Sequence, residues 1–218
     1  MKKDQYFHFG LAMLIVYIFF MSCNLDRIDN AGPFQCGQTI VDPRDGKSYK
    51  TIWIADDGSH NLSMPGKCWL AENLNFNTSN AFSNCYNEAN VRCDTFGRMY
   101  NSLALASACL NGWHLATTTE WSDLFKTYGW TEIITGNGPI YSGDSLAFLP
   151  GGLSKMNFLM GGSCFPGPEA CSDIGNSIGF WASDKFHNTF FNKSGSSSVF
   201  AIQFAENDQR YYIRCVKN

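Results

Sequence analysis

Residues 109–129, CLNGWHLATTTEWSDLFKTYG, predict their own local structure better than any other stretch of the chain. Thr117 and Glu120 have the spacing of a capping box, in which the threonine hydroxyl accepts from a free backbone N–H and the glutamate reaches back. An apolar face follows at the helical period, formed by Trp121, Leu124, Phe125 and Tyr128. Gly129 offers the left-handed residue that ends a helix. We therefore expect a short helix whose aromatic face needs a partner surface, because three turns rarely hold together alone.

The composition favours one folded domain. The 218 residues include 20 Gly, 18 Phe, 9 Tyr and 6 Trp, and only 16% are charged. A chain of this length is long enough for one domain with a substantial core. The formal net charge is -3, and removal of residues 1–22 would leave 14 basic and 18 acidic residues. This balance disfavours nucleic-acid binding, because contacts with phosphates need a basic surface.

The N-terminus has the pattern of a bacterial export signal. Two lysines precede an apolar run at residues 9–21, and a serine precedes Cys23. The run is short for a membrane-spanning helix, which needs about 20 apolar residues. The sequence FMSC at residues 20–23 resembles a lipoprotein signal. We expect residues 1–22 to be the signal peptide, Cys23 to carry the lipid, residues 23–40 to form a tether and residues 41–218 to form the domain. Ordinary signal cleavage is the alternative.

The cysteines indicate the same export route. The chain has nine, and assignment of Cys23 to the lipid leaves eight, which can form four bridges. No C-x-x-C occurs, and the remaining cysteines lack zinc-ligand spacing. We therefore expect disulfides in an oxidising compartment and no metal bound by cysteine.

Beyond residue 41 the chain consists of short patterned segments separated by Gly-, Asn- and Ser-rich loops. Strand patterns occur at 41–54, 148–152, 157–160, 179–182, 198–204 and 210–216. A second helix is predicted at 98–110, a short helical or extended piece at 67–74, and a turn-rich stretch at 136–143. Two short helices among many short strands predict an α+β fold with much of the chain in loops.

Seven motifs follow one another along this region: VDPRDGKSYKTI (41–52), CWLAENLN (68–75), CYNEANVRCDTFGRMYN (85–101), CLNGWHLATTTEWSDL (109–124), FLPGG (148–152), FWASD (180–184) and YYIRCVKN (211–218). In this order they resemble the Fibrobacter succinogenes major paralogous domain family. That family resembles the C-type-lectin-like and formylglycine-generating-enzyme (sulfatase-modifying factor) folds. The resemblance implies loop-rich α+β structure around a small twisted antiparallel sheet. It implies no reaction, since function depends on the site.

The resemblance also implies a set of disulfides. It pairs Cys109 with Cys215 and Cys85 with Cys93. The leftover pairs are then Cys164 with Cys171 and Cys36 with Cys68. The first bridge closes a loop of more than 100 residues, which the chain-entropy model values at about 4 to 5 kcal/mol.

No catalytic motif stands out. An oxidase resembling formylglycine-generating enzymes needs a redox-active cysteine pair, but the sequence around Cys164 and Cys171 does not match that enzyme's active site. A Ser/His/Asp hydrolase is disfavoured as well, because His60 and His187 lie in polar loops and no nucleophile elbow occurs. His114 is expected to pack in a turn beside Trp113. We therefore expect a protein that is not an enzyme.

A lectin-like calcium site is the alternative cofactor prediction. Carboxylate and amide oxygens suit calcium, and the candidates are Glu169, Asp173, Asn176 and Asp184. They surround Trp181, which together with Asp173 and Asp184 is also a candidate ligand-binding residue. The family's own aromatic-Trp-Ser motif explains these residues without a metal. The leading expectation is therefore that the protein has no cofactor.

The sequence as a whole predicts an exported surface lipoprotein that acts as a binding or adhesion module, with polysaccharide as the candidate ligand. Membrane contact comes through the lipid on Cys23, in the outer membrane or at the cell surface. The alternatives are an enzyme related to formylglycine-generating oxidases and a structural component of an envelope complex with a protein partner. Specificity is expected in the loops between residues 136 and 198.

Overall fold

The computed structural model describes residues 33–218 except 80–81, 166–170, 185–186, 193–197 and 205–207. The predicted signal peptide, Cys23, most of the predicted tether and Glu169 lie outside the described residues. A compact unit spans Gln35–Asn218, so it begins a few residues before the expected boundary at 41. In the described part of the chain, no helix has the length and apolar character needed to cross a membrane.

Two larger sheets and a small ribbon make up the β structure. One sheet has the order β1-β2-β3-β14-β6, with β1 (Thr39–Val41), β2 (Ser48–Ala55), β3 (Gly66–Leu70), β14 (Cys215–Lys217) and β6 (Trp113–Leu115). The other has the order β10-β9-β11-β12-β13-β8-β7, with β7 (Thr131–Thr135), β8 (Gly138–Gly143), β9 (Gly161–Cys164), β10 (Cys171–Ile174), β11 (Ser177–Trp181), β12 (His187–Asn192) and β13 (Ser198–Phe204). The ribbon pairs β4 (Ser83–Asn84) with β5 (Met99–Tyr100).

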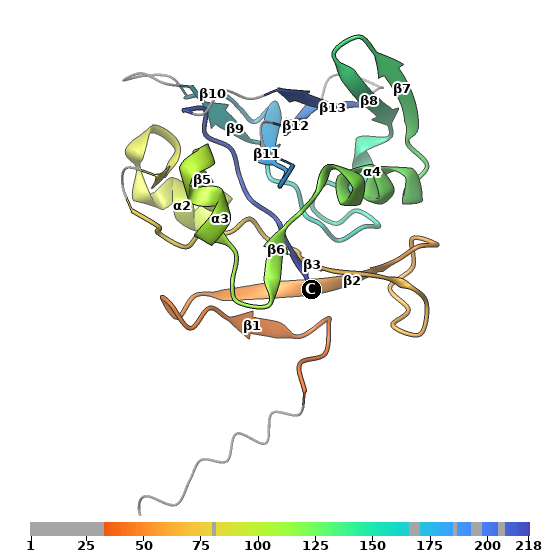
Figure 1. Ribbon diagram of the computed structural model, residues 1–218, viewed down its shortest axis with the longest axis horizontal. Helices are drawn as coiled ribbons and strands as arrows, with labels where there is room; N and C mark the ends of the chain where they lie inside the picture. The colour runs from red at the N-terminus through yellow and green to blue at the C-terminus, as the bar shows by residue number, and fades with distance from the viewer. Residues whose placement is uncertain (1–32, 80–81, 166–170, 185–186, 193–197, 205–207) are drawn as a thin grey trace, which may run out of the picture. The chain divides into compact units, whose positions relative to one another are not determined.

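The helices of the described residues are short. They are α2 (Asn90–Phe96), α3 (Leu105–Ala108) and α4 (Thr118–Thr127), together with three 3-10 turns at Tyr86–Glu88, Ser102–Ala104 and Ser145–Ala147. Figure 1 shows the two larger sheets at opposite ends of the domain, with α4 on one side between them and α2 and α3 on the other. All strand pairs are antiparallel except the contact between β9 and β11. The expected loop-rich α+β class is confirmed, but among the described residues two larger sheets and a two-stranded ribbon replace the single small sheet.

The predicted helix at residues 117–129 is confirmed as α4. Thr117 and Glu120 form both hydrogen bonds of the capping box, and Gly129 has a φ of 78° just beyond the helix. Trp121, Leu124 and Phe125 are buried on one face. Local capping and apolar spacing therefore predict where this helix begins, where it ends and which face it buries.

Trp121 is the centre of the core that this helix faces. Its side chain has no exposed surface, and its ring centroid lies 4.9–6.3 Å from those of Trp69, Phe125, Phe158, Phe180 and Phe200. Trp69 belongs to β3, and Phe180 and Phe200 belong to β11 and β13. The aromatic face of α4 therefore finds its partner surface in both larger sheets.

Four disulfides tie the chain together. They join Cys36 to Cys68, Cys85 to Cys93, Cys109 to Cys215 and Cys164 to Cys171. These are the pairs that the resemblance implies. Cys215 lies in β14, the strand between β3 and β6, so its bridge to Cys109 anchors the C-terminal strand to the segment that leads into β6 and α4.

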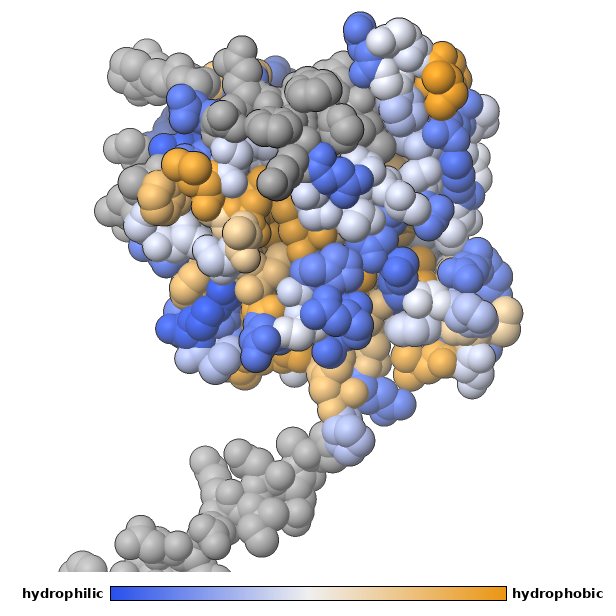
Figure 2. All heavy atoms as spheres, in the orientation of Figure 1, coloured by the Kyte–Doolittle hydropathy of each residue, from blue (hydrophilic) through white to orange (hydrophobic). Residues whose placement is uncertain are grey.

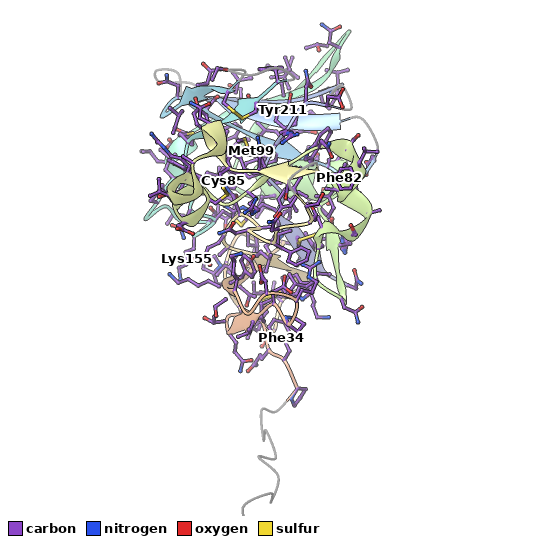
Figure 3. The ribbon with its side chains drawn as sticks, turned by 90° about the vertical axis from the view of Figure 1, so that its left-hand side faces the viewer. Phe34, Phe82, Cys85, Met99, Lys155 and Tyr211 are labelled. Carbon is purple, nitrogen blue, oxygen red and sulfur yellow. A yellow bond between two sulfur atoms is a disulfide. The ribbon has the colours of Figure 1, made fainter. Side chains whose placement is uncertain are left out.

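The predicted helix at 98–110 is wrong in its first half. Met99 and Tyr100 form strand β5, Asn101 caps a 3-10 turn, and only Leu105–Ala108 is α-helical. Tyr100 also forms a bridge with Tyr211, and the view of Figure 3 places Met99 close to Cys85 and Tyr211. Pairing with a distant strand therefore outweighs the local helical spacing of the alanines.

The turn-rich stretch at 136–143 is instead the second half of a hairpin. β7 and β8 pair from Thr131 with Ser142 to Thr135 with Gly138, with Gly136-Asn137 as a two-residue loop. Such a loop is a recognised hairpin signal. The prediction missed the hairpin because the glycines in this stretch were interpreted only as turn residues. His187, expected in a loop, opens strand β12.

Two predicted strands between β8 and β9 are also wrong. The segment 148–152 follows the 3-10 turn Ser145–Ala147, which Asp144 caps, and the Phe148 N–H donates to the Ser145 carbonyl. In the segment 157–160, Asn157 has a φ of 48°, which is incompatible with an extended strand. Strand β9 starts only at Gly161, where a Cβ would collide with the Tyr212 hydroxyl.

Candidate functional site

A pocket of about 660 Å³ opens on the side of the domain formed by β2, α2 and the last strand. Its walls come from the start of β2, the segment after β3, the C-terminal end of α2, and Arg214. We call it the Arg214 pocket. Its volume lies within the range of small-molecule sites, which is roughly 300–1,000 Å³. It is therefore large enough for a ligand of a few rings.

Arg214 lies at the inner wall of this pocket. It immediately precedes β14 between Ile213 and Cys215, which are both fully buried, and the residue itself is only 1% exposed. Its Nε donates to the Asn73 side-chain oxygen at 2.7 Å, and Nη1 donates to the Leu70 carbonyl at 3.1 Å. The Cys215 disulfide and the strand pairing therefore hold a guanidinium at a fixed place beside the opening.

The guanidinium has unused hydrogen-bonding capacity. An arginine carries five N–H donors, and two of them have acceptors here, which leaves three. No carboxylate of the described residues forms an ion pair with Arg214. The Phe158 and Phe180 rings lie 5.4 and 5.7 Å from its Cζ. A buried cation of this kind normally has an anionic partner.

Burial shifts the titration of this group without removing its charge. Loss of water around Arg214 lowers the pKa of the guanidinium well below its usual value, to about 9, and the field of Glu72 offsets only part of that effect. The side chain is therefore protonated at neutral pH. The pocket wall therefore contains a positive charge that forms no ion pair with a carboxylate of the described residues, although the field of Glu72 acts on it.

The two lysines at the rim of the pocket are already paired with carboxylates. The ammonium group of Lys50 lies 3.8 Å from Glu72, and that of Lys47 lies 2.8 Å from Asp45. Asp94 also lines the pocket. Among the lysines and arginines of the wall, Arg214 is therefore the cation without a carboxylate partner in the described structure.

Amide groups surround the same opening. Asn73, Asn75 and Asn157 line it, and the Asn75 side chain makes no hydrogen bond with a described residue. The close approach of α2 depends on Gly97, which has a φ of 82° and whose Cβ would lie 2.7 Å from the Asn73 Cβ. Gly97 therefore lets the end of α2 approach Asn73 closely, and polar side chains line the opening between them.

A second polar cluster surrounds Glu120 at the start of α4. The carboxylate is 5% exposed and accepts from the Thr117 N–H at 2.9 Å. Lys67 Nζ lies 3.2 Å from it, and His114 Nε2 lies 3.0 Å away. The other ring nitrogen of His114 contacts Asn218. Glu120 thus links the cap of α4 to strands β3 and β6, which favours a structural role.

We expect this cluster to make stability pH-dependent. Burial raises the pKa of Glu120, but the hydrogen bonds from Thr117, Lys67 and His114 outweigh burial and leave the pKa below its usual value of 4.5. A carboxyl with a depressed folded-state pKa stabilises the fold above about pH 4.5 and loses that contribution as the pH falls through the folded-state pKa. Glu120→Gln should therefore cost about 1 to 3 kcal/mol at pH 7 and less below pH 4.

Urea unfolding of the wild type and of Glu120→Gln at pH 7, 5, 4 and 3 measures this difference. Glu132→Gln is the matched control, because Glu132 also pairs with a lysine but lies at the surface. A surface pair contributes little, so the control should leave stability nearly unchanged at each pH. A Glu120→Gln deficit that stays constant from pH 7 to pH 3 would contradict the assignment.

Trp181 is not a ligand-binding residue. It is fully buried, and its indole N–H donates to the Tyr100 carbonyl within the core. A side chain without exposed surface has no face on which a sugar ring can stack. The motif 180–184 supplies core packing at Trp181, as the family interpretation of these residues implied.

The calcium candidates do not converge. Asp173 lies in β10 and Asn176 in the turn between β10 and β11, whereas Asp184 follows the opposite end of β11. The Asp184 carboxylate accepts from the N–H and hydroxyl of Thr118, at the start of α4. Within the described residues, no group of three or more His, Cys, Asp or Glu side chains is arranged to hold a metal ion. Glu169 lies outside the described residues.

The cysteine candidates for oxidase chemistry form a disulfide between neighbouring strands. Cys164 in β9 and Cys171 in β10 are directly opposite in the strand register, and their sulfurs are bonded. His60 lies in the loop between β2 and β3 and contacts the carbonyls of Trp53 and Leu153 through its two ring nitrogens. Neither group forms part of the Arg214 pocket.

The sequence interpretation missed this pocket. It placed specificity between residues 136 and 198, but only Pro150, Asn157 and Leu159 of the lining fall in that range. One signal was present: Arg214 interrupts the apolar run of the last strand, in the sequence YYIRCV. A charged residue within a buried strand needs a partner or a ligand, and this marks the position for inspection.

Comparison with known proteins gives no match: no family model fits the chain, and no curated protein or solved structure is significantly similar to it. The chemistry of the pocket is therefore the basis for the functional conclusion.

Proposed function

We propose that this protein is an exported, lipid-anchored binding module for polysaccharide, without enzymatic activity. Its scaffold is of the C-type-lectin-like or sulfatase-modifying-factor-like type, and its ligand binds in the Arg214 pocket. The lipid on Cys23 tethers it to the bacterial envelope, at the outer membrane or cell surface.

One observation carries this proposal: a pocket of about 660 Å³ holds a buried guanidinium with no carboxylate partner among the described residues. Catalysis by acid and base needs a pair of suitably placed titratable groups, and the described lining offers mainly amides, hydroxyls and paired charges. Such a wall suits recognition. The four disulfides support an oxidising compartment, where a scaffold of this kind is stabilised.

A glycan array probed with the purified full chain in detergent micelles tests the binding function. The array is read with calcium and with a chelator. We expect saturable binding to at least one glycan under both conditions, because the described residues bring no calcium ligands together. Absence of glycan binding, with recovery of a stable envelope protein partner instead, would overturn the proposal.

Acyl labelling tests the tether independently. We expect metabolic incorporation of a labelled fatty acid into the wild type, loss of the label in Cys23→Ala, and accumulation of the unprocessed precursor with the signal-peptidase inhibitor globomycin. Asn30→Gln, a substitution in the tether outside the signal, is the control that should keep the label. Label that survives Cys23→Ala contradicts a lipid at this position.

A further inference from the structure

We propose that the ligand of the Arg214 pocket is an acidic saccharide, and that Arg214 holds its carboxylate. This inference rests on the proposed function and names the chemical class of ligand for that site. It follows from the donors that Arg214 leaves unused, from the charges around it and from the polar side chains of the wall.

The unused donors fit a carboxylate. Arg214 keeps three N–H groups without an acceptor in the described structure, after the bonds to Asn73 and Leu70. A guanidinium presents parallel N–H groups that match the two oxygens of a carboxylate in a bidentate pair. Its bonds to Asn73 and Leu70 also fix the plane of the group before a ligand arrives, so little side-chain freedom is lost on binding.

The charge of the wall selects a ligand with one negative group at this point. Lys47 and Lys50 are neutralised by Asp45 and Glu72, so they add little attraction. Glu72 and Asp94 line the same pocket and would repel a dense cluster of negative charge such as a polyphosphate. Among the lysines and arginines of the wall, Arg214 is the cation without a carboxylate partner in the described structure, so a single carboxylate of the ligand can pair with it.

The remaining wall favours a sugar ring over a peptide. The Asn75 amide has no partner among the described residues, and the Ser48 hydroxyl lines the same wall. Asn157 and Thr95 also line it, but the Asn157 amide bonds to Gly151 and Lys155 and the Thr95 hydroxyl donates to the Val91 carbonyl. Ring hydroxyls both donate and accept, as these side chains do. A peptide would need backbone donors and acceptors along an open strand edge, whereas this lining consists mainly of side chains from separate elements.

Titration calorimetry of the full chain in detergent micelles tests the inference with defined probes. The acidic probes are the trimers of galacturonate, glucuronate and mannuronate, and sialyllactose. The neutral probes are the carboxyl-reduced trimers and lactose. A tripeptide with a free C-terminus represents a peptide carboxylate. We expect at least one acidic probe to bind at least tenfold more tightly than its neutral counterpart and than the tripeptide.

Variants then place the binding in the pocket. Arg214→Gln should weaken binding of the acidic probe at least tenfold. Because Arg214 is buried and this variant can fail to fold, Asn75→Asp provides a second test: it adds a negative charge beside the site at a partly buried side chain that makes no described hydrogen bond. It should also weaken binding at least tenfold. Asn137→Asp, in the exposed β7–β8 loop, is the matched control and should bind as the wild type does.

The outcomes separate this inference from the proposed function. Equal binding of an acidic probe and its reduced counterpart, or binding that Asn75→Asp leaves unchanged, overturns the carboxylate assignment while the protein remains a glycan-binding module. Tighter binding of the tripeptide overturns the saccharide assignment. No binding of any acidic probe also overturns the inference, and the glycan array then decides whether the binding function stands.

Discussion

A Trp121→Ala variant is expected to lose about 3 to 5 kcal/mol of unfolding free energy, the usual cost of removing a large aromatic side chain from a core. Trp121 has no exposed surface and contacts rings from α4, β3, β11, β13 and the segment before β9. Its indole N–H also donates to the Trp181 carbonyl at 3.3 Å. Because the total unfolding free energy of a domain is only about 5 to 15 kcal/mol, the variant should be near the limit of folding.

Chemical unfolding under non-reducing conditions, followed by tryptophan fluorescence and far-UV circular dichroism, measures this loss. Leu153→Ala is the control, because Leu153 is 78% exposed and its removal should change the unfolding free energy by less than about 0.5 kcal/mol. A loss below about 1.5 kcal/mol for Trp121→Ala would mean that the α4 face is not the centre of the core.

Removal of the bridge between Cys109 and Cys215 is expected to cost about 4 to 5 kcal/mol, the second large effect. The bridge joins residues 106 positions apart, and in the chain-entropy model a longer closed loop restricts the unfolded chain more strongly. It also holds β14 between β3 and β6, and Arg214 immediately precedes β14. The double variant Cys109→Ala/Cys215→Ala should therefore have a lower unfolding free energy and should also bind ligand more weakly in the Arg214 pocket.

The Cys85–Cys93 bridge is the matched control for this comparison. Its cysteines are only 8 positions apart, so Cys85→Ala/Cys93→Ala should lose about 2 to 3 kcal/mol. Unfolding midpoints of the two double variants, measured in the same guanidinium series, give the difference directly. An equal loss, or a larger loss for the short loop, would contradict the entropic explanation.

The sequence was sufficient where the deciding residues are neighbours along the chain. The capping box of Thr117 and Glu120 and the spacing of Trp121, Leu124 and Phe125 specify α4 locally, and the structure shows both. Strand β13 has the predicted bounds, because its pattern needs no special backbone conformation. The disulfide pairs came from the family resemblance, because cysteine spacing alone does not determine which cysteines pair.

Prediction failed where a distant partner or one unusual residue decides the structure. Met99 and Tyr100 leave the helical pattern because they pair with β4 and with Tyr211. Asn157 adopts a positive φ that its sequence neighbours do not reveal. The Arg214 pocket is the extreme case, because its wall combines β2, the segment after β3, the end of α2 and the last strand. No local sequence pattern predicts a site whose walls come from such distant segments.

Exposed apolar residues outside the pocket mark one other surface. Ile133 and Ile134 on β7 are 52% and 75% exposed, and Figure 2 shows an apolar patch over the β7–β8 hairpin at the upper right. β7 is also an edge strand of its sheet. Nothing in the structure identifies a molecule that covers it, so the Arg214 pocket remains the site to which function is assigned.

The most direct test of that assignment is the nuclear magnetic resonance spectrum of the isotope-labelled full chain during titration with the acidic probe that binds best in calorimetry. The Arg214 Nε–H signal and the amide signals of residues 72–75 and 94–97 report on the pocket wall. We predict saturable shifts concentrated in these signals, while those of residues 131–143 in the β7–β8 hairpin stay unchanged. Shifts confined to the hairpin, or a bound state in which the Arg214 signal does not move, would contradict the pocket as the binding site.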